Sequence, residues 1–180
     1  MVTEKSSLRG MAYASMFGAL TAVGAYIMIP LPLVPITLQT LFVILAGSLL
    51  GGYLGALSQV VYILLGVIGL PVFSGGKAGF GVLIGPTGGY LIGFVVGALV
   101  IGKLTSLRRD PGLLWMMGSM LAGIAIIYTL GIAQLMLVAK LGFIKAISVG
   151  LLPPLPGEII KIVVAAFICR KIRGRIIKKI

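Results

Sequence analysis

Long apolar stretches, separated by short segments rich in glycine, proline or cations, constrain the fold of this sequence more than any other feature. A helix of about 20 residues spans the hydrocarbon core of a bilayer. By that measure the chain contains six candidate spans, at residues 8–29, 36–51, 53–69, 82–104, 113–139 and 154–172. The second and third are short, so a re-entrant pair is an alternative, although their summed length favours two helices. We therefore expect an all-α integral membrane protein with one transmembrane domain over residues 1–180.

The charge balance points to a bilayer rather than to nucleic acid. Charged residues make up 10% of the chain, against roughly 25% in soluble domains. The net charge is +12, from 15 Lys and Arg against 3 Asp and Glu, and in a soluble protein it would suggest a nucleic-acid partner. Here the cations lie at the ends of apolar stretches, and attraction to anionic lipid explains the C-terminal cluster. We expect a multi-pass protein of the cell membrane.

The distribution of Lys and Arg predicts the orientation. Six spans place both termini on one side, and a cation excess marks the cytoplasmic side. The opposite side has Lys77, Lys140 and Lys145. The side of the termini has Lys5, Arg9, Lys103, Arg108, Arg109, Arg170, Lys171, Arg173, Arg175, Lys178 and Lys179. This excess of eleven over three predicts that both termini are cytoplasmic and that the first, third and fifth connections are external.

Several function classes are excluded by what the chain lacks. It has no histidine and a single cysteine, Cys169, so a metal site with the usual nitrogen and sulfur ligands is not expected. The segment ending in Lys77 superficially resembles a phosphate loop, but Pro71 replaces the first glycine and Ala78 replaces the Ser or Thr after the lysine. We therefore expect no nucleotide hydrolysis and no cofactor.

Glu158 and Lys161 are the only opposite charges placed together inside an apolar stretch. Three residues apart, they share one face of a helix, and intramembrane ionisable residues mark functional sites by default. Glu158 follows Pro153, Pro154 and Pro156, so it could simply complement the helix dipole. Lys161 has the wrong sign for a helix N-terminus; it could snorkel to the surface, but we favour a paired or ligand-facing charge.

The external connections converge on the end of the bundle from which Glu158 would be reached. Residues 30–35 hold three prolines that stiffen the crossing, and the glycines in 69–81 allow close backbone approach. Pro86 interrupts the fourth span, so free backbone groups there could face a cavity, or the glycines beside it could pack against a helix. Tyr90 and Gln39 are candidate ligand contacts near this end.

Small residues form one face of the first span. Ala14 and Gly18 are four residues apart, as are Ser15 and Ala19 beside them. Small residues at this spacing let helices approach closely in lipid. The face serves either internal packing or the docking of another membrane protein, and the spacing alone leaves both open.

Five collinear motifs, which cover nearly the whole chain, resemble the BioY family, the biotin-binding S-components of energy-coupling factor transporters. They are residues 21–25, 35–41, 69–76, 85–91, and 156–158 with Lys161. The resemblance implies a six-helix membrane protein without enzymatic activity that captures biotin from outside. It also implies a transmembrane coupling protein, which contacts the small-residue face, and a pair of ABC-type ATPases. The chain departs from the family pattern in Glu158, where Asp is usual, and in Ser15 and Gly18, where alanines are usual.

The chemistry of biotin matches these residues. A carboxylate can accept from the ureido N–H groups and an ammonium can donate to the ureido oxygen, while apolar walls would bury the ring. Lys77 is the candidate for the valerate carboxylate, with Lys161 as the alternative. The full set of expected substrate-binding residues is Glu158, Lys161, Lys77, Tyr90, Gln39, Phe73, Val72 and Thr87.

Three other functions remain as alternatives at this stage. The chain could bind another small vitamin or carboxylate. It could be a membrane-embedded enzyme that uses Glu158 as an acid or base, although a second catalytic carboxylate and a nucleophile with a partner base are missing. It could also be a channel or scaffold subunit in which the charged pair is only structural.

Overall fold

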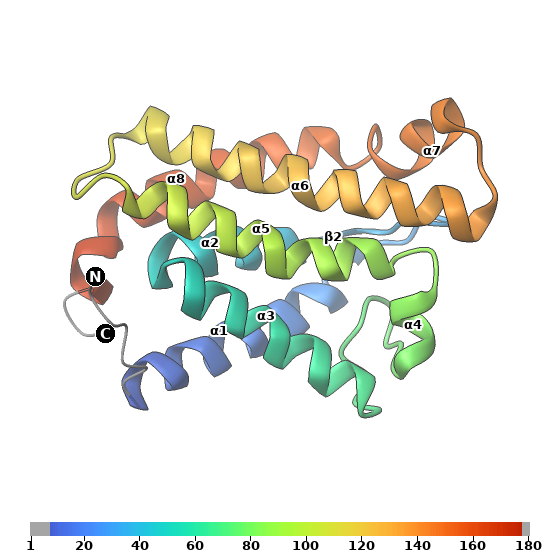
Figure 1. The fold of residues 1–180 in the computed structure, drawn as a ribbon, viewed down its shortest axis with the longest axis horizontal. Helices are drawn as coiled ribbons and strands as arrows, with labels where there is room; N and C mark the ends of the chain where they lie inside the picture. Colours follow the sequence, from blue (N-terminus) through green and yellow to red (C-terminus); the bar gives the residue numbers. More distant parts are fainter. Residues whose placement is uncertain (1–7, 178–180) are drawn as a thin grey trace.

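The computed structural model describes residues 8–177, with side chains as far as Arg173. Long helices run along the long axis of the molecule, and α1 begins at the same end at which α8 finishes (Figure 1). Lys5, Lys178 and Lys179, used above for orientation, lie outside the described residues, as does the side chain of Arg175. The elements are α1 (Leu8–Tyr26), β1 (Met28–Ile29), β2 (Ile36–Thr37), α2 (Gln39–Leu50), α3 (Gly52–Val67), α4 (Phe80–Ile84), α5 (Gly88–Ser106), α6 (Leu113–Ala139), α7 (Phe143–Gly150) and α8 (Leu155–Ile177).

Each predicted span contains at least part of a helix, and the described residues are helical apart from one short hairpin, an isolated β-bridge between Phe73 and Lys77, and the connections. Within the described residues, α5 and α6 are long and apolar enough to cross a membrane, and α7 with α8, bent by 51°, would make a third span. Helices α2 and α3 are apolar but shorter. The number of crossings and the side of the termini therefore remain predictions.

The structure corrects several predicted boundaries. The first span ends at Tyr26 and the second begins at Gln39, because Met28–Ile29 pairs with Ile36–Thr37 in an antiparallel hairpin around the proline-rich loop. The predicted fourth span, 82–104, is broken between α4 and α5, since Pro86 cannot donate a backbone hydrogen bond there.

The ends of the last two spans also differ from expectation. The last helix runs on to Ile177, beyond the predicted residue 172. Helix α7, in the fifth connection, was not predicted.

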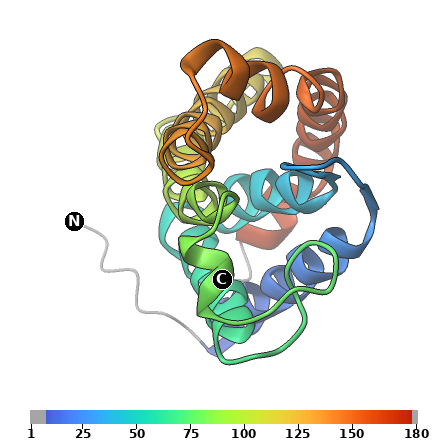
Figure 2. The same ribbon diagram turned by 90° about the vertical axis from the view of Figure 1, so that its right-hand side faces the viewer.

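Helix α2 occupies the centre of the bundle. It contacts α1, α3, α5, α6 and α8, while α1 and α3 lie on the opposite side from α6 and α7 (Figure 2). Glycines allow these close approaches: a methyl group added to Gly47 would lie 2.6 Å from the carbonyl oxygen of Ala98, on α5. The start of α2, where the site forms, is therefore enclosed by several helices.

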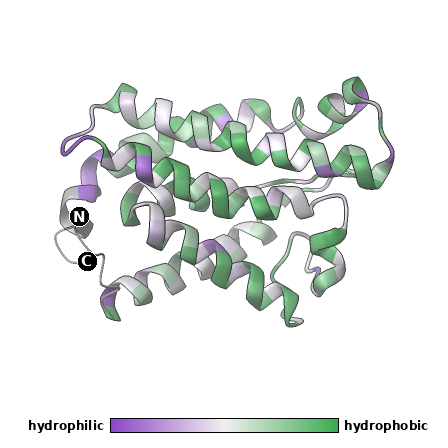
Figure 3. Cartoon of the chain, in the orientation of Figure 1, coloured by the Kyte–Doolittle hydropathy of each residue, from purple (hydrophilic) through white to green (hydrophobic). Residues whose placement is uncertain are grey.

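Polarity is distributed as expected of a protein in lipid. Hydrophobic residues cover the helices, and hydrophilic ones gather in the loop between α5 and α6 and near the end of α8 (Figure 3). Leu114 and Leu137 are more than three-quarters exposed, whereas Gln39, Gln59 and Glu158 are buried. Polar side chains that point inward at membrane depth need partners inside the protein.

Candidate functional site

A cavity opens at the end of the bundle where α2 and α8 begin. The empty space within it, including space open to solvent, is about 670 Å³, and residues from α2, α4, α5, α6, α8 and the connections α1–α2 and α3–α4 line it. Phe73, Leu91 and Phe94 give it apolar walls, and Gln39, Thr40 and Glu158 are among its polar groups. An apolar cavity with a few converging polar groups is the usual form of a small-molecule site.

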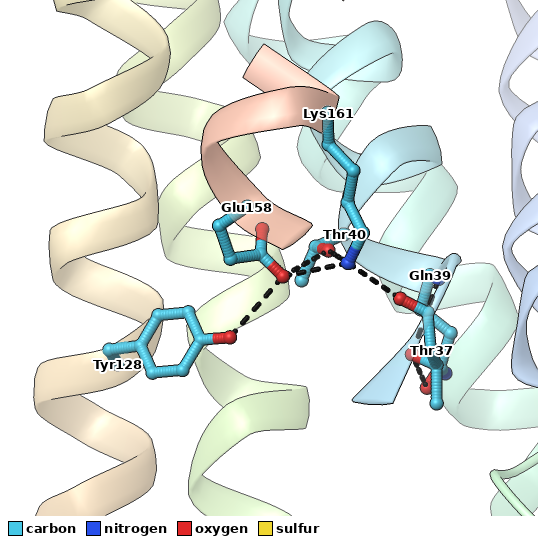
Figure 4. A network of polar contacts seen from close by, with 6 residues as sticks. All are labelled: Thr37, Gln39, Thr40, Tyr128, Glu158 and Lys161. Carbon is cyan, nitrogen blue, oxygen red and sulfur yellow. Dashed lines mark hydrogen bonds and ion pairs between the residues drawn. The ribbon is translucent and has the colours of Figure 1, made fainter. Parts of the chain in front are cut away.

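Glu158 and Lys161 form a buried ion pair beside this cavity. Lys161 Nζ lies 2.7 Å from Glu158 Oε1, and the two side chains are 7% and 3% exposed. The hydroxyl of Thr40 donates to the same oxygen at 2.9 Å, and that of Tyr128 at 3.3 Å (Figure 4). Three helices, α2, α6 and α8, thus converge on one carboxylate oxygen.

Lys161 has every one of its hydrogen-bond donors occupied. Its ammonium donates to the Thr37 carbonyl oxygen at 2.7 Å, to Thr40 Oγ1 at 2.8 Å and to Glu158 Oε1 at 2.7 Å, and an ammonium has three donors. The three acceptor residues line the cavity, whereas Lys161 is not among the described residues that do. Such full pairing offsets the desolvation cost of a buried charge.

The second oxygen of the carboxylate is in the opposite situation. Glu158 Oε2 is buried and has no hydrogen-bond partner among the described residues. Leaving a buried acceptor unsatisfied costs about 1–3 kcal/mol, and more for a charged group. Because Glu158 lines the cavity, an N–H or O–H donor on a bound molecule could satisfy this oxygen.

Local backbone structure places these groups. Prolines at the start of α8 need no N–H partner there, and the N–H of Glu158 donates to the Pro154 carbonyl oxygen at 3.0 Å. The N–H of Leu38 donates to the carbonyl oxygens of Gly24 and Ile27, both at 3.1 Å, which fixes the start of α2 against the end of α1. The Thr37 carbonyl is thereby held toward Lys161.

Aromatic residues form part of the cavity wall. Tyr90 and Tyr128 meet edge to face, with ring centroids 5.7 Å apart, and the Tyr90 hydroxyl donates to the Gly150 carbonyl oxygen at 3.0 Å. Phe73 packs in the same manner on Tyr62 at 5.6 Å. These contacts hold the rings in place.

Most expected ligand contacts meet at this cavity. Glu158, Lys77, Tyr90, Gln39, Phe73 and Thr87 line it. Lys161 is one hydrogen bond away, through Glu158 or Thr40. The half-buried Val72 is not among the described lining residues. The ligand-contact assignments themselves remain predictions.

The break between α4 and α5 serves packing and the cavity together. Gln134 Nε2 donates to the carbonyl oxygens of Leu83 and Gly85, both at 2.8 Å, and so satisfies groups that the break exposes. A methyl group on Gly89 would lie 2.3 Å from the Leu130 carbonyl oxygen, which confirms close helix packing. Thr87, at the same break, lines the cavity.

The small-residue face of α1 is divided between two environments. Ala14 and Gly18 are buried, and a methyl group on Gly18 would lie 2.9 Å from the Ser58 carbonyl oxygen of α3. Internal packing therefore accounts for these two residues. Ser15 and Ala19 are exposed, so the predicted docking surface now depends on them.

Sequence reasoning did not include Thr40 and Tyr128 among the ligand-site residues. Thr40 lies 118 residues from Glu158 along the chain, and Tyr128 lies 30 residues away. The sequence contains only weak indications of their role. Thr40 directly follows the candidate Gln39, and Tyr128 carries a hydroxyl group within an apolar span.

Comparisons with known proteins agree on one family. The model of the BioY family matches residues 1–178. The biotin transporter BioY of Thermotoga maritima is 46% identical over 166 residues, which cover 92% of this chain and 96% of that protein. The biotin transporter BioY of Rhizobium etli is 41% identical over 146 residues, covering 77% and 78% of the two chains.

A solved structure has the same fold. The crystal structure of the S-component for biotin from an ECF-type ABC transporter superposes with a TM-score of 0.85 at 26% identity. The match covers 97% of this chain and 95% of that one.

Proposed function

The chain belongs to the BioY family, and from this membership we propose that it is a biotin transporter, the membrane-embedded biotin-binding S-component of an ECF-type ABC transporter. It is a multi-pass membrane protein, and its family consists of transporters, not enzymes. We assign residues 1–180 to one transmembrane substrate-binding domain with both termini in the cytoplasm. Biotin then enters the cavity from the external side.

The unpartnered oxygen of Glu158 is the observation that supports this function most. Glu158 lines the cavity, and its Oε2 is a buried acceptor without a donor among the described residues. The ureido ring of biotin carries N–H donors, and a charge-assisted N–H to carboxylate bond is among the stronger hydrogen bonds in proteins. We assign a ureido N–H of biotin to Glu158 Oε2.

The rest of the ligand fits the remaining walls. Phe73, Tyr90 and Phe94 offer apolar surface to the thioether ring and the valerate chain. Lys77 lines the cavity and is exposed, so it is free to bind the valerate carboxylate. Lys161 is less suited to that role, because a direct bond to ligand would require Nζ to release one of its three acceptors.

The partners follow from the ECF context of the solved relative. We propose that the chain works with a transmembrane coupling protein and a pair of ABC-type ATPases, and that the exposed Ser15 and Ala19 of α1 contribute to the docking surface. Replacing Ala19 by Trp should spare biotin binding and impair coupled uptake. Normal uptake by that variant would remove α1 from the docking surface.

Calorimetry on the purified protein tests the function. Biotin should bind and raise the melting temperature, and Glu158→Gln should abolish or strongly weaken binding. A biotin analogue methylated at the ureido nitrogens should bind poorly, because it has lost the donors for Glu158. If the wild-type protein does not bind biotin but co-purifies with another small vitamin or carboxylate, the alternative specificity is correct.

A further inference from the structure

The hydroxyl of Thr40 contacts both members of the buried ion pair. Thr40 is the second residue of α2 and is 7% exposed. Its Oγ1 lies 2.9 Å from Glu158 Oε1 and 2.8 Å from Lys161 Nζ. Threonine is branched at Cβ, which restricts its side-chain rotation. The hydroxyl is thus held at one point between two charged groups of α8.

The direction of each of these hydrogen bonds is fixed by chemistry. An ammonium only donates and a carboxylate only accepts. The Thr40 hydroxyl must therefore accept from Lys161 and donate its single proton to Glu158 Oε1. An aliphatic side chain, which has neither a donor nor an acceptor, could make neither contact.

This arrangement makes the two carboxylate oxygens different. Oε1 accepts from Thr40, Tyr128 and Lys161, whereas Oε2 has no partner among the described residues. Lys161 lies on the same helix as Glu158, and the Tyr128 contact is the longest of the three, at 3.3 Å. Thr40 is thus the closest donor from a different helix, and it opposes rotation of the carboxylate.

We propose that Thr40 is a positioning residue that fixes the rotation of the Glu158 carboxylate, so that Oε1 is bonded within the protein and Oε2 is left for a ligand that carries an N–H donor. The proposal depends on the proposed function, since the donor that it assigns to Oε2 is a ureido N–H of biotin. Thr40 acts through Glu158, while the ligand itself bonds to Oε2.

Three variants test this role by calorimetry with biotin and with its ureido N-methylated analogue. Thr40→Val keeps the shape and removes the hydroxyl, and Thr40→Ala removes the hydroxyl without adding bulk. Loss of a hydrogen bond to a charged group should raise the Kd for biotin about 10- to 100-fold in both. Thr40→Ser keeps the hydroxyl and should stay within about threefold of wild type, because both contacts can still form.

The ratio of the two Kd values separates positioning from general destabilisation. If Thr40 no longer fixes the carboxylate, Thr40→Val should lose affinity for biotin but little affinity for the analogue. The Kd of the analogue divided by the Kd of biotin should therefore fall about tenfold. A purely structural defect would weaken both equally. An unchanged ratio, or a Thr40→Ser variant as weak as Thr40→Val, would overturn the proposal. Absence of biotin binding by the wild-type protein would instead refute the proposed function.

Discussion

Two buried cations on α8, Lys161 and Arg173, have opposite hydrogen-bond environments. They are 6% and 8% exposed. Lys161 donates to three acceptors and faces a carboxylate. Arg173 donates through Nη2 to the Thr105 carbonyl oxygen at 3.2 Å, while its Nε and Nη1 are buried and have no partner within the described part of the chain.

The difference shows that burial of a charge does not by itself mark a ligand site. Around Lys161, the Thr37 carbonyl of β2 and the side chains of Thr40 and Glu158 accept from every donor, and one oxygen of Glu158, a residue that lines the cavity, has no partner among the described residues. Around Arg173, the donors themselves are left over, and Arg173 is not among the described residues that line that cavity. Complete pairing around a single unsatisfied atom indicates a preorganised binding site; incomplete pairing indicates a charge that packing tolerates at a cost.

Removing Lys161 should have the largest effect. Lys161→Ala leaves Glu158 buried without a counter-charge and frees Thr37 and Thr40, so biotin affinity should fall at least about 100-fold. Calorimetry on the purified variant measures this, and its melting temperature reports whether it folds. A folded variant with wild-type affinity would remove Lys161 from the site.

Shortening Glu158 should have a smaller effect. Glu158→Asp keeps the charge but withdraws the carboxylate by one methylene from Thr40 and Tyr128. We expect a loss of about tenfold in biotin affinity, close to that of one hydrogen bond to a charged group. Titration with biotin checks this. Undiminished affinity would mean that Thr40 and Tyr128 do not set the position of the carboxylate.

Lys77 differs from Lys161 and Arg173 because it lines the cavity but is exposed to solvent. Because exposed ion pairs contribute about 0–1 kcal/mol, Lys77→Ala should weaken biotin binding no more than about fivefold. The matched control is Lys145→Ala, an exposed lysine of α7 that is not among the described lining residues, and it should leave the Kd unchanged. Equal effects of the two changes would exclude a specific bond from Lys77 to the valerate carboxylate.

Removing Arg173 should have the smallest effect on binding. Arg173→Met deletes two unpartnered nitrogens, Nε and Nη1, along with the hydrogen bond from Nη2 to the Thr105 carbonyl oxygen. Replacing a poorly paired buried charge by an apolar side chain is often neutral or stabilising, so the Kd for biotin should stay within about twofold and the melting temperature should not fall. A loss of affinity comparable to that of Lys161→Ala would show that the two cations are coupled.

The sequence predicts helices well where an apolar pattern is uninterrupted. Helix α6 has the predicted bounds, 113–139, because no proline or charge interrupts this span. Helix α7 was missed because the sequence reading assigned the whole fifth connection to a loop, whereas residues such as Ala146 are buried by tertiary packing. Pro86 marked the break before α5 but did not show that the preceding residues form the separate helix α4.

The sequence predicted the part of the site that lies within a single helix. Glu158 and Lys161 pair within one helical turn, so their spacing alone places them together. Thr40 and Tyr128 reach the same oxygen from two other helices, and the sequence contains no measure of that proximity. The unsatisfied Oε2 depends on all three contacts and becomes visible only in the folded structure.

A structure of the protein with biotin bound would test the assignment of the ligand to Glu158 most directly. A ureido nitrogen should lie about 2.7–3.2 Å from Glu158 Oε2, while Oε1 keeps its bonds to Lys161 and Thr40. A bound biotin whose valerate carboxylate contacts Lys161, or whose ureido ring lies away from Oε2, would contradict the proposed binding mode.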